Sequence, residues 1–354
     1  MASKKKKNAT KVDTAVTIVN WNGKHWLKDC LNSLEKQSYG KLMIILIDND
    51  SSDGSVEFVE KNFPSVKVIK LKKNYGFSKG NNAGVEEAFK SNDIKYIFVL
   101  NNDTIVHKDC LKNLIKEAES GKKLGSCATK ILYLKKKDTI NTDGIIIYQD
   151  GHAQSLHAFE KASKHNKKME VFGPTAVAAL YKREALEKAG LYDNMFFMYQ
   201  EEVDLAWRLR YAGYSSVLVP NAIVYHAHSA SSERFSPFKA YHTERNRIWL
   251  VFKNFTCLMI IKSFYYTIKR YMALIKGLKT KKGSAAEFAK KRSKLDIALI
   301  LLKAYAVGIA LLPLFIPKRI KTQYLRIKNK VGRKEINKWF KKFSTDAERL
   351  ALLK

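Results

Sequence analysis

The stretch Ile97-Phe98-Val99-Leu100-Asn101-Asn102-Asp103-Thr104 runs from four apolar residues directly into two amides, a carboxylate and a hydroxyl. An uninterrupted apolar run of this kind is typical of a parallel strand that is buried on both faces. In open α/β sheets, ligands bind in the crevice beyond the carboxyl ends of the strands. Asp103 is therefore a candidate ligand of a hydrated divalent cation, with a plain Asn-Asp turn as the alternative.

Segments with strand and helix patterns alternate on both sides of this stretch. Apolar runs predict strands over 15–20, 42–47 and 66–71, and apolar residues at helical spacing predict helices over 26–37, 56–62 and 83–90. Short connections between alternating strands and helices are typical of parallel sheets with right-handed crossovers. The expected fold class is α/β, an α/β/α sandwich around a mostly parallel sheet.

Polar residues stand where the first two predicted strands end, as they do after the central strand. Asn20 closes the first strand and Asp48 the second, so both are expected beside Asp103 at the ligand-binding edge. Asp53 is placed to cap the next helix while Asp48 faces the crevice. Because no GxGxxG follows the first strand and no GxxxxGKS/T occurs, neither a Rossmann dinucleotide site nor a P-loop is predicted.

After residue 122 the pattern is less regular. Strands are predicted over 124–134, 144–149, 176–181, 216–219 and 223–225, with a helix over 183–189. A polar loop at 151–168 is expected either to cover a site or to be simply solvated. His226 follows the last of these strands, a position that suits a metal ligand or a phosphate donor, although a lone surface histidine is also common.

Three carboxylates lie within four residues at the start of a predicted helix that ends near Gly213: Glu201, Glu202 and Asp204. Glu201 and Asp204 share one face of this helix with Arg208, whereas Glu202 points about 100° away. Acidic residues in a first turn ordinarily complement the helix dipole. The aromatic residues just ahead would also desolvate these carboxylates and raise their pKa toward use as a base, so both interpretations stay open.

The charge of the chain is strongly positive and unevenly spread. Lys and Arg number 65 against 33 Asp and Glu, which gives a net charge of +32 over 354 residues. From Pro237 onward there are 29 basic and 6 acidic residues, so +23 of this charge lies in the last third. Such an excess indicates an anionic partner or a membrane surface. Four widely spaced cysteines without a CxxC or Cys/His cluster argue against zinc and disulfide frameworks and fit a reducing compartment.

Three regions are expected along the chain. Residues 1–11 form a basic, disordered tail without the apolar stretch of a secretory signal, and 12–235 form the α/β domain. Residues 236–354 form a basic helical region with two apolar stretches, 255–275 and 295–316, both interrupted by charged residues. Because a membrane span needs about 20 cleaner apolar residues, amphipathic helices in the headgroup region are expected, with a helical subdomain packed on the core as the alternative.

These motifs, taken in this order, resemble those of family 2 glycosyltransferases, the nucleotide-sugar-dependent enzymes of the GT-A type, and of their rhamnosyltransferase-like branch in particular. The resemblance covers 12–235. It rests on VTIVNWNG at 16–23, DNDSSD at 48–53, NYGFSKGNN at 74–82, LNNDT at 100–104, EEVDL at 201–205 and VYH at 224–226. The Gln-x-x-Arg-Trp motif of processive members is not found in this chain, so a non-processive enzyme is implied.

The resemblance also implies roles for individual residues. Asp48 would bind the base or ribose of the nucleotide, and Asp103 would be the last carboxylate of the family's DxD metal motif, whose first position is Asn101 here. His226 matches the family's histidine near the metal and diphosphate, so the implied cofactor is Mg²⁺ or Mn²⁺ on Asp103 and His226. The other residues of the implied nucleotide-sugar site are Asn20, Asn49, Asp53, Gly76, Phe77, Asn82, Asn102, Glu201 and Arg208.

The family's acid pair reads Glu201-Glu202 here, which implies Glu202 as the catalytic base, while the helix-face geometry leaves Asp204 as the alternative. The implied reaction is an inverting single displacement, in which a carboxylate takes the proton of the acceptor hydroxyl.

By the same resemblance, the chain would be a hexosyl or rhamnosyl transferase that uses a dTDP-, UDP- or GDP-linked sugar. Its acceptor would be a lipid-linked glycan in cell-surface polysaccharide or glycoprotein glycan assembly. The chain is expected at the cytoplasmic face of the cell membrane, peripheral or monotopic, bound to an anionic membrane surface and not to nucleic acid. Two alternatives are a non-catalytic membrane-associated scaffold with a nucleotide-sugar fold and a basic nucleic-acid-binding protein.

Overall fold

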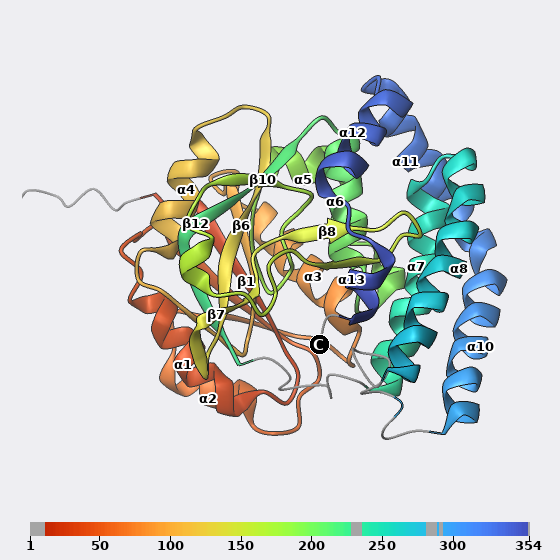
Figure 1. Ribbon diagram of the computed structural model, residues 1–354. Coiled ribbons are helices and arrows are strands. Elements are labelled where there is room, and N and C mark those ends of the chain that lie inside the picture. The colour runs from red at the N-terminus through yellow and green to blue at the C-terminus, as the bar shows by residue number, and fades with distance from the viewer. Residues whose placement is uncertain (1–10, 228–235, 281–288, 290–292, 353–354) are drawn as a thin grey trace, which may run out of the picture.

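The computed structural model describes residues 11–227, 236–280, 289 and 293–352; residues 1–10 of the expected tail at 1–11 lie outside the described residues. The strands are β1 Thr14–Asn20, β2 Leu42–Asp48, β3 Lys67–Lys70, β4 Tyr96–Asn101, β5 Thr104–Val106, β6 Leu124–Tyr133, β7 Lys136–Thr142, β8 Ile145–Ile147, β9 Ala153–Ser155, β10 Met169–Val171, β11 Ala178–Lys182 and β12 Ser215–His226. Within this part of the chain, ten strands form one sheet, and β8 and β9 form a separate hairpin. The order in the sheet is β10-β12-β6-β11-β4-β1-β2-β3, with β5 beside β12 and β7 beside β6 (Figure 1).

The parallel half of the sheet brings three strand ends to one edge. β1 pairs in parallel with both β2 and β4, and its register sets Asn20 opposite Asp48 and Val19 opposite Asn101. The polar residues that follow these strands therefore lie side by side, as the sequence predicts. On the other side of β4, β11 runs antiparallel to both β4 and β6, so the complete sheet is mixed.

The helices around the sheet are α1 Lys24–Glu35, α2 Ser55–Asn62, α3 Gly76–Phe89, α4 Cys110–Glu119, α5 Arg183–Ala189 and α6 Glu201–Tyr211, with short 3₁₀ turns at Ala162–Lys164 and Asn194–Phe196. Alternate residues of β4 pack into two apolar cores, one on each face of the sheet. Phe98 and Leu100 pack with α1 and α4 on one face, and Ile97 and Val99 pack with α3, α5 and α6 on the other. This is the strand buried on both faces that its unbroken apolar run predicts.

Helix α3 and strand β12 differ from the sequence-based expectation. Helix α3 begins at Gly76, seven residues before the predicted start at Ala83, and its first turns contain Gly76 and Gly80. A Cβ at Gly80 would lie 2.9 Å from the Val19 side chain, so glycine lets α3 pack closely on β1. The two predicted strands at 216–219 and 223–225 are one strand, β12, with a register shift between Val219 and Ile223.

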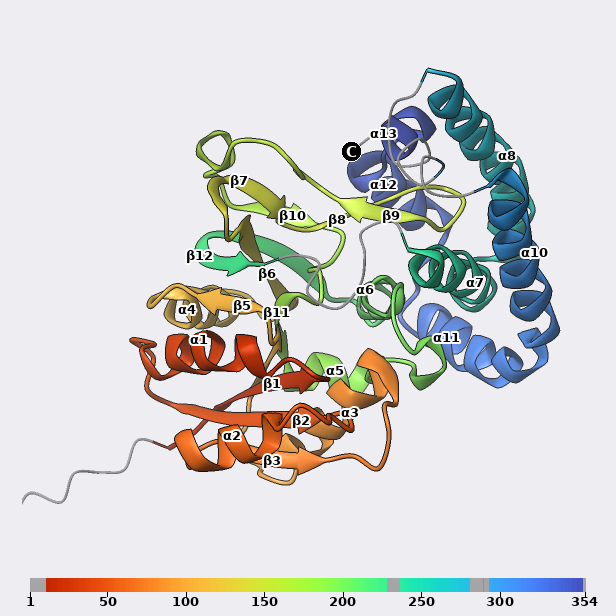
Figure 2. The same ribbon diagram turned by 90° about the horizontal axis from the view of Figure 1, so that it is seen from below.

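The C-terminal region is helical and lies against α6. Its elements are α7 Pro237–Asn254, α8 Cys257–Lys279, α10 Lys294–Ala310, a 3₁₀ turn at Leu312–Phe315, α11 Ile316–Lys328, α12 Arg333–Phe343 and α13 Ala347–Leu352. Figures 1 and 2 show α7 between α6 and α10, with α8 and α10 outermost. Trp207 of α6, Trp249 of α7 and Trp339 of α12 share one apolar cluster.

The expected boundary between residues 235 and 236 does not divide the packing. Two side chains of α7, which lies beyond this boundary, bond a buried residue of α6. Lys253 donates to Asp204 over 3.0 Å, and Asn254 donates to the same carboxylate over 2.8 Å. Removing one partner of a buried charge pair costs about 3–5 kcal/mol. Helix α7 is thus joined to α6 by buried polar contacts across the expected boundary, which the sequence pattern does not reveal; the division at 235 stays a prediction.

Among the described helices, no single one is both long and apolar enough to cross a membrane. One pair passes the same test of length and composition together, 295–310 with 312–328, and it is bent by 55°. The predicted apolar stretch at 295–316 is thus divided between α10, the 3₁₀ turn and the start of α11.

Candidate active site

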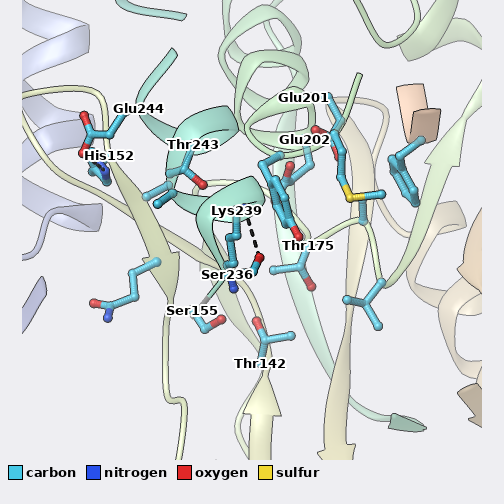
Figure 3. A pocket seen from close by; sticks show the side chains of 18 of the residues that line it. Thr142, His152, Ser155, Thr175, Glu201, Glu202, Ser236, Lys239, Thr243 and Glu244 are labelled. Atoms are coloured by element: carbon cyan, nitrogen blue, oxygen red, sulfur yellow. Dashed lines mark hydrogen bonds and ion pairs between the residues drawn. The ribbon is translucent and has the colours of Figure 1, made fainter. Parts of the chain in front are cut away.

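A cavity of about 1000 Å³ opens beyond the carboxyl ends of β1 and β4. Its wall on the strand side includes Trp21, Asn49, Asn102 and Asp103, and its opposite wall comes from α6, α7 and the β8–β9 hairpin. Figure 3 shows Glu201 and Glu202 on one side, His152 and Glu244 on the other, and Lys239 and Thr243 of α7 between them. The segment 151–168 contributes His152 to this lining, which favours the first of its two expected roles, that of covering a site.

Amides fix the floor of the cavity at the strand ends. Asn20 donates to Asp48 over 3.3 Å and to Ser51 over 3.2 Å, and its oxygen accepts from Asn102 over 2.8 Å. A Cβ at Gly23 would lie 2.2 Å from the Asn102 amide nitrogen. Glycine at this position thus makes room for the amide pair. Of the predicted donor-site residues, Asn20 and Asp48 are buried supports in this network, while Asn102 reaches the cavity.

A second group of predicted residues joins α3 to the segment before α6. Asn49 donates to Asn74 over 3.0 Å and to the Gly76 carbonyl over 3.1 Å. Gly76 has φ +81°, and a Cβ there would lie 2.5 Å from the Phe197 carbonyl oxygen. The Phe77 backbone N–H donates to that carbonyl over 2.6 Å. Asn49, Gly76 and Phe77 all line the cavity, as expected of donor-binding residues.

Two predicted donor-site residues, Asp53 and Asn82, form hydrogen bonds with the protein backbone. Asp53 accepts from the Lys24 backbone N–H over 2.8 Å and from the Ser55 backbone N–H over 3.0 Å, which ties the starts of α1 and α2 together. Asn82 donates to the Tyr192 carbonyl over 2.7 Å and accepts from the Tyr192 N–H over 3.1 Å. The N-cap residue of α2 is Gly54 and not Asp53, although Asp53 accepts from the first residue of that helix. The hydrogen bonds of Asp53 and Asn82 do not favour direct contact of either residue with a donor.

Asp204 and Arg208 form a buried ion pair. Arg208 donates to Asp204 over 2.9 Å, and its other nitrogens reach the carbonyls of Ala189, Gly190 and Leu191. Lys253 completes the pair, and Asp204 is 0% exposed. Although burial opposes it, the charges of Arg208 and Lys253 hold the pKa of Asp204 below its ordinary value. The face of α6 that carries Asp204 and Arg208 therefore points into the protein, and this geometry disfavours Asp204 as the base and Arg208 as a donor-binding residue.

Glu201 and Glu202 are the two carboxylates of the acidic cluster at the start of α6 that line the cavity. Each has one carboxylate oxygen, Oε2, that is buried and without a hydrogen-bond partner among the described residues. Burial raises the pKa of both groups; for Glu201 the neighbouring charge of Glu202 adds to the rise, and for Glu202 the Lys239 ammonium opposes it. A buried carboxylate with a raised pKa and an open oxygen is suited to proton transfer.

The backbone ahead of these glutamates is strained and is held by α7. Phe197, Tyr199 and Gln200 have φ values of 64°, 73° and 72°, and each such non-glycine residue costs about 1–3 kcal/mol. The buried Asn246 amide donates to the carbonyls of Phe196, Met198 and Tyr199 over 2.9, 2.9 and 2.7 Å. The sequence contains no local signal for this role, because the two segments meet only in the folded chain.

Asp103 and His226 meet as the sequence predicts. The Asp103 carboxylate lies 3.1 Å from His226 Nε2, and His226 Nδ1 lies 3.0 Å from the Asn141 side-chain oxygen. No group of three or more His, Cys, Asp or Glu among the described residues is arranged to hold a metal by itself. Mg²⁺ typically keeps several waters and binds through one or two carboxylates plus substrate phosphates. The pair therefore fits a cation shared with a diphosphate, and Asn101 supplies no second carboxylate.

Some lining residues escaped the sequence-based prediction. Trp21 follows Asn20 directly and is 47% exposed at the cavity, so an aromatic residue just after a strand end was an available signal. Asn141, Thr142, Thr175 and Lys239 also line the cavity. They come from β7, a loop and α7, and their spacing in sequence gives no hint that they meet.

Comparison with known proteins identifies relatives of the α/β part. Residues 15–190 match the model of the family described as glycosyl transferase family 2. The poly-beta-1,6-N-acetyl-D-glucosamine synthase of Staphylococcus epidermidis is 23% identical over 206 residues, which are 57% of this chain and 47% of that protein. The N-acetylglucosaminyl-diphospho-decaprenol L-rhamnosyltransferase of Mycobacterium tuberculosis is 24% identical over 261 residues, 66% of this chain and 82% of that protein. The chain thus spans about half the length of the first relative.

Solved structures share the fold. GalNAc-T7 with UDP, GalNAc and Mn²⁺ superposes with a TM-score of 0.59 at 15% identity, over 75% of this chain and 51% of that chain. The mannosyltransferase PcManGT from Pyrobaculum calidifontis with GDP-Man and Mn²⁺ superposes with a TM-score of 0.51 at 16% identity, over 93% of this chain and 88% of that chain. The GT-A fold expected from the sequence is confirmed.

Proposed function

Since the chain belongs to glycosyltransferase family 2, we propose that it transfers a hexosyl or rhamnosyl group from a nucleotide-sugar donor to an acceptor hydroxyl, non-processively and with inversion. The observation that carries this proposal is one cavity that contains both the Asp103–His226 pair and the open carboxylate oxygens of Glu201 and Glu202. The first pair suits the diphosphate of a donor, and the second suits the hydroxyl of an acceptor.

The strand-end wall of the cavity is the proposed donor site. The exposed ring of Trp21 offers a face for a nucleobase, and the side chains of Asn49 and Asn102 offer amide groups for the ribose or the phosphates. Asp48 supports this wall through Asn20. A dTDP-, UDP- or GDP-linked sugar is the proposed donor class.

Glycosyl transfer needs one base that takes the proton of the acceptor hydroxyl. As the acceptor oxygen attacks the anomeric carbon, the bond from that carbon to the diphosphate breaks and the hydroxyl proton passes to the Glu202 carboxylate. Single displacement of this kind inverts the anomeric carbon. Such general-base assistance contributes about 10²- to 10⁴-fold in rate. Glu201, with the higher proton affinity of a carboxyl beside another carboxylate, is proposed to stay protonated and to hold the sugar.

Asp103 and His226 are the proposed ligands of Mg²⁺ or Mn²⁺. When bound, such a cation neutralises charge on the departing nucleoside diphosphate. Asn141 holds the ring of His226 through Nδ1 and so orients Nε2 toward Asp103. The presence of Mn²⁺ in both structural neighbours supports this assignment.

Donor binding is tested by thermal unfolding of the full chain with a panel of dTDP-, UDP- and GDP-sugars and Mn²⁺. A ligand at 100 times its Kd stabilises the folded state by about 2.7 kcal/mol, so at least one donor should raise Tm by several degrees. Trp21→Ala should remove most of this shift, whereas Met169→Ala, which changes an exposed residue outside the cavity lining, should preserve it. A panel in which no nucleotide sugar changes Tm would contradict the proposed donor class.

The C-terminal helices are proposed to hold the enzyme on an anionic membrane surface at the cytoplasmic face, as a peripheral or monotopic protein. Large apolar side chains are exposed along α8, α10 and α11, among them Ile261 at 67%, Phe264 at 68% and Ile320 at 65%. Lysines such as Lys262, Lys269 and Lys321 stand among them. Apolar faces that enter the headgroup region and basic residues near an anionic leaflet act together. Four free cysteines fit the reducing side of the membrane.

We expect the full chain to float with liposomes that contain anionic lipid. Each basic residue near such a surface contributes about 1 kcal/mol, so binding should weaken on neutral liposomes and at high salt. Replacing both Phe264 and Ile268 by serine should reduce flotation, and Met169→Ser, which removes an exposed apolar residue elsewhere, should not. Absence of flotation on anionic liposomes at low salt would contradict membrane attachment.

A further inference from the structure

The cavity extends well beyond the catalytic carboxylates. Past Thr243 and His152 it continues between α8 and α10, and its lining changes from polar to apolar. The residues of this apolar arm are Leu274, Ile275 and Leu278 on α8, and Ile297, Ile300 and Leu301 on α10. No role in donor binding or in proton transfer requires such a lining.

Helical spacing explains how the arm is built. Residues 271, 274, 275 and 278 fall on one face of α8, and residues 297, 300, 301 and 305 on one face of α10. The hydroxyls of Tyr271 and Tyr305 lie 3.2 Å apart and join the two helices at the inner end of the arm. From this pair, the apolar residues continue toward the C-terminal end of α8 and the N-terminal end of α10, which are the outermost helices in Figures 1 and 2.

The inner end of the arm carries charges that already neutralise each other. Arg270 lies 2.6 Å from Asp150 and 2.9 Å from Glu244, and Glu244 also pairs with Arg247 over 3.1 Å. Burial lowers the pKa of the adjacent His152, which favours its neutral form. This balanced cluster has two cations for two anions, so it offers little attraction to a separate anionic ligand. It instead marks the border between the polar and apolar parts of the cavity.

The outer end of the arm meets the exposed apolar surface. Ile275 is 51% exposed and Leu278 is 40% exposed, yet both line the arm. On the same two helices, Phe264, Met272 and Leu302 are exposed at 68%, 65% and 66%. Helix α10 is apolar around most of its circumference, which is typical of a helix with apolar surroundings on more than one side. The arm is thus continuous with the surface that is proposed to face the membrane.

We propose that the apolar arm binds the hydrocarbon chain of an amphiphilic acceptor, a polyisoprenoid or acyl carrier whose polar head extends to Glu202. This inference rests on the proposed glycosyl transfer and names where the lipid of its acceptor lies. The chain enters laterally from the membrane between α8 and α10. The polar head lies among the hydroxyl side chains around Lys239, which include Thr142, Ser155 and Thr243 (Figure 3). The length of the arm keeps the acceptor hydroxyl at the carboxylate while the rest of the lipid stays in the bilayer.

The test uses the full chain in detergent micelles and a long-chain alkyl phosphate that carries a diazirine near the end of its chain. After irradiation, mass spectrometry should find the label on peptides that contain 274–278 or 297–301. Ile300→Trp, which fills the arm, should reduce labelling of these peptides at least fivefold. Leu302→Trp adds the same ring on the outer side of the same helix and should leave the labelling unchanged. If Ile300→Trp does not fold, Leu274→Trp is used in its place, because it adds the same ring to the arm from the α8 side.

Activity provides a second readout. The arm-filling variants should raise the KM for a long-chain lipid-linked acceptor about tenfold and leave transfer to a short-chain analogue unchanged. Labelling confined to outward residues such as 261–268, or equal labelling of wild type and arm-filling variants, would overturn the inference. The rise in Tm with nucleotide sugar is measured in the same proteins. If the wild type shows no rise, the proposed function is contradicted. The labelling result still stands on its own in that case, because α8 and α10 do not form the strand-end wall of the cavity.

Discussion

Glu202→Gln is expected to lower kcat by about 10²- to 10⁴-fold, the usual contribution of a general base. Glutamine has the size and hydrogen-bonding groups of the glutamate but cannot accept a proton at neutral pH. The affinity for nucleotide sugar, measured as the rise in Tm, should change little, because the proposed donor site lies on the strand-end wall of the cavity and Glu202 belongs to α6. Activity of Glu202→Gln within tenfold of wild type would contradict the assignment of the base.

The pH profile and a neighbouring variant refine this experiment. Burial raises the pKa of Glu202, so kcat/KM should fall, on acidification, at a higher pH than for an ordinary glutamate with a pKa of about 4.3.

Asp204→Asn should act differently from Glu202→Gln, since it breaks the buried contacts with Arg208 and Lys253. Loss of a partner from such a cluster costs about 3–5 kcal/mol, so this variant should show a strongly lowered Tm, whereas Glu202→Gln should not.

Asp103→Ala is expected to abolish transfer while preserving the fold. The carboxylate contacts His226 at the edge of the cavity and contributes little to the apolar cores. Charge neutralisation by a bound cation contributes several kcal/mol, so the rate should fall at least a hundredfold, about 2.7 kcal/mol. The effect of Mn²⁺ on Tm in the presence of nucleotide sugar should disappear as well.

Asp29→Ala serves as the matched control, because Asp29 is an exposed aspartate on α1 outside the cavity lining. It should keep both the activity and the Mn²⁺-dependent rise in Tm. If Asp103→Ala folds and keeps more than a tenth of the wild-type rate, the metal role of the Asp103–His226 pair is wrong.

The sequence predicted those parts of the site that depend on local patterns. An unbroken apolar run predicted β4, and the register of parallel strands then brings Asn20, Asp48 and Asn101 to one edge. The spacing of Glu201 and Glu202 at the start of a helix was equally visible. Strand ends and helix starts are set by neighbouring residues, so they can be read along the chain.

Interactions between distant segments were not accessible in this way. Asp204 has the same type of side chain and nearly the same position as the glutamates, and only Lys253 and Asn254 reveal that it is buried in an ion-pair cluster. Asn246 holds the strained segment before α6 from a different helix. The contacts of α7 with α6 across the expected boundary at 235 were hidden for the same reason, because the change in composition there says nothing about packing.

The most direct test of the account is the anomeric configuration of the product, determined by NMR after transfer from a defined nucleotide sugar to a lipid-linked acceptor by the full chain. A single displacement assisted by Glu202 inverts the anomeric carbon, so an α-linked donor should yield only the β-linked product, and a β-linked donor only the α-linked one. A product that retains the donor configuration would contradict the single displacement. Binding of the donor without any transferred sugar, across the panel of donors, would indicate a nucleotide-sugar fold without catalysis.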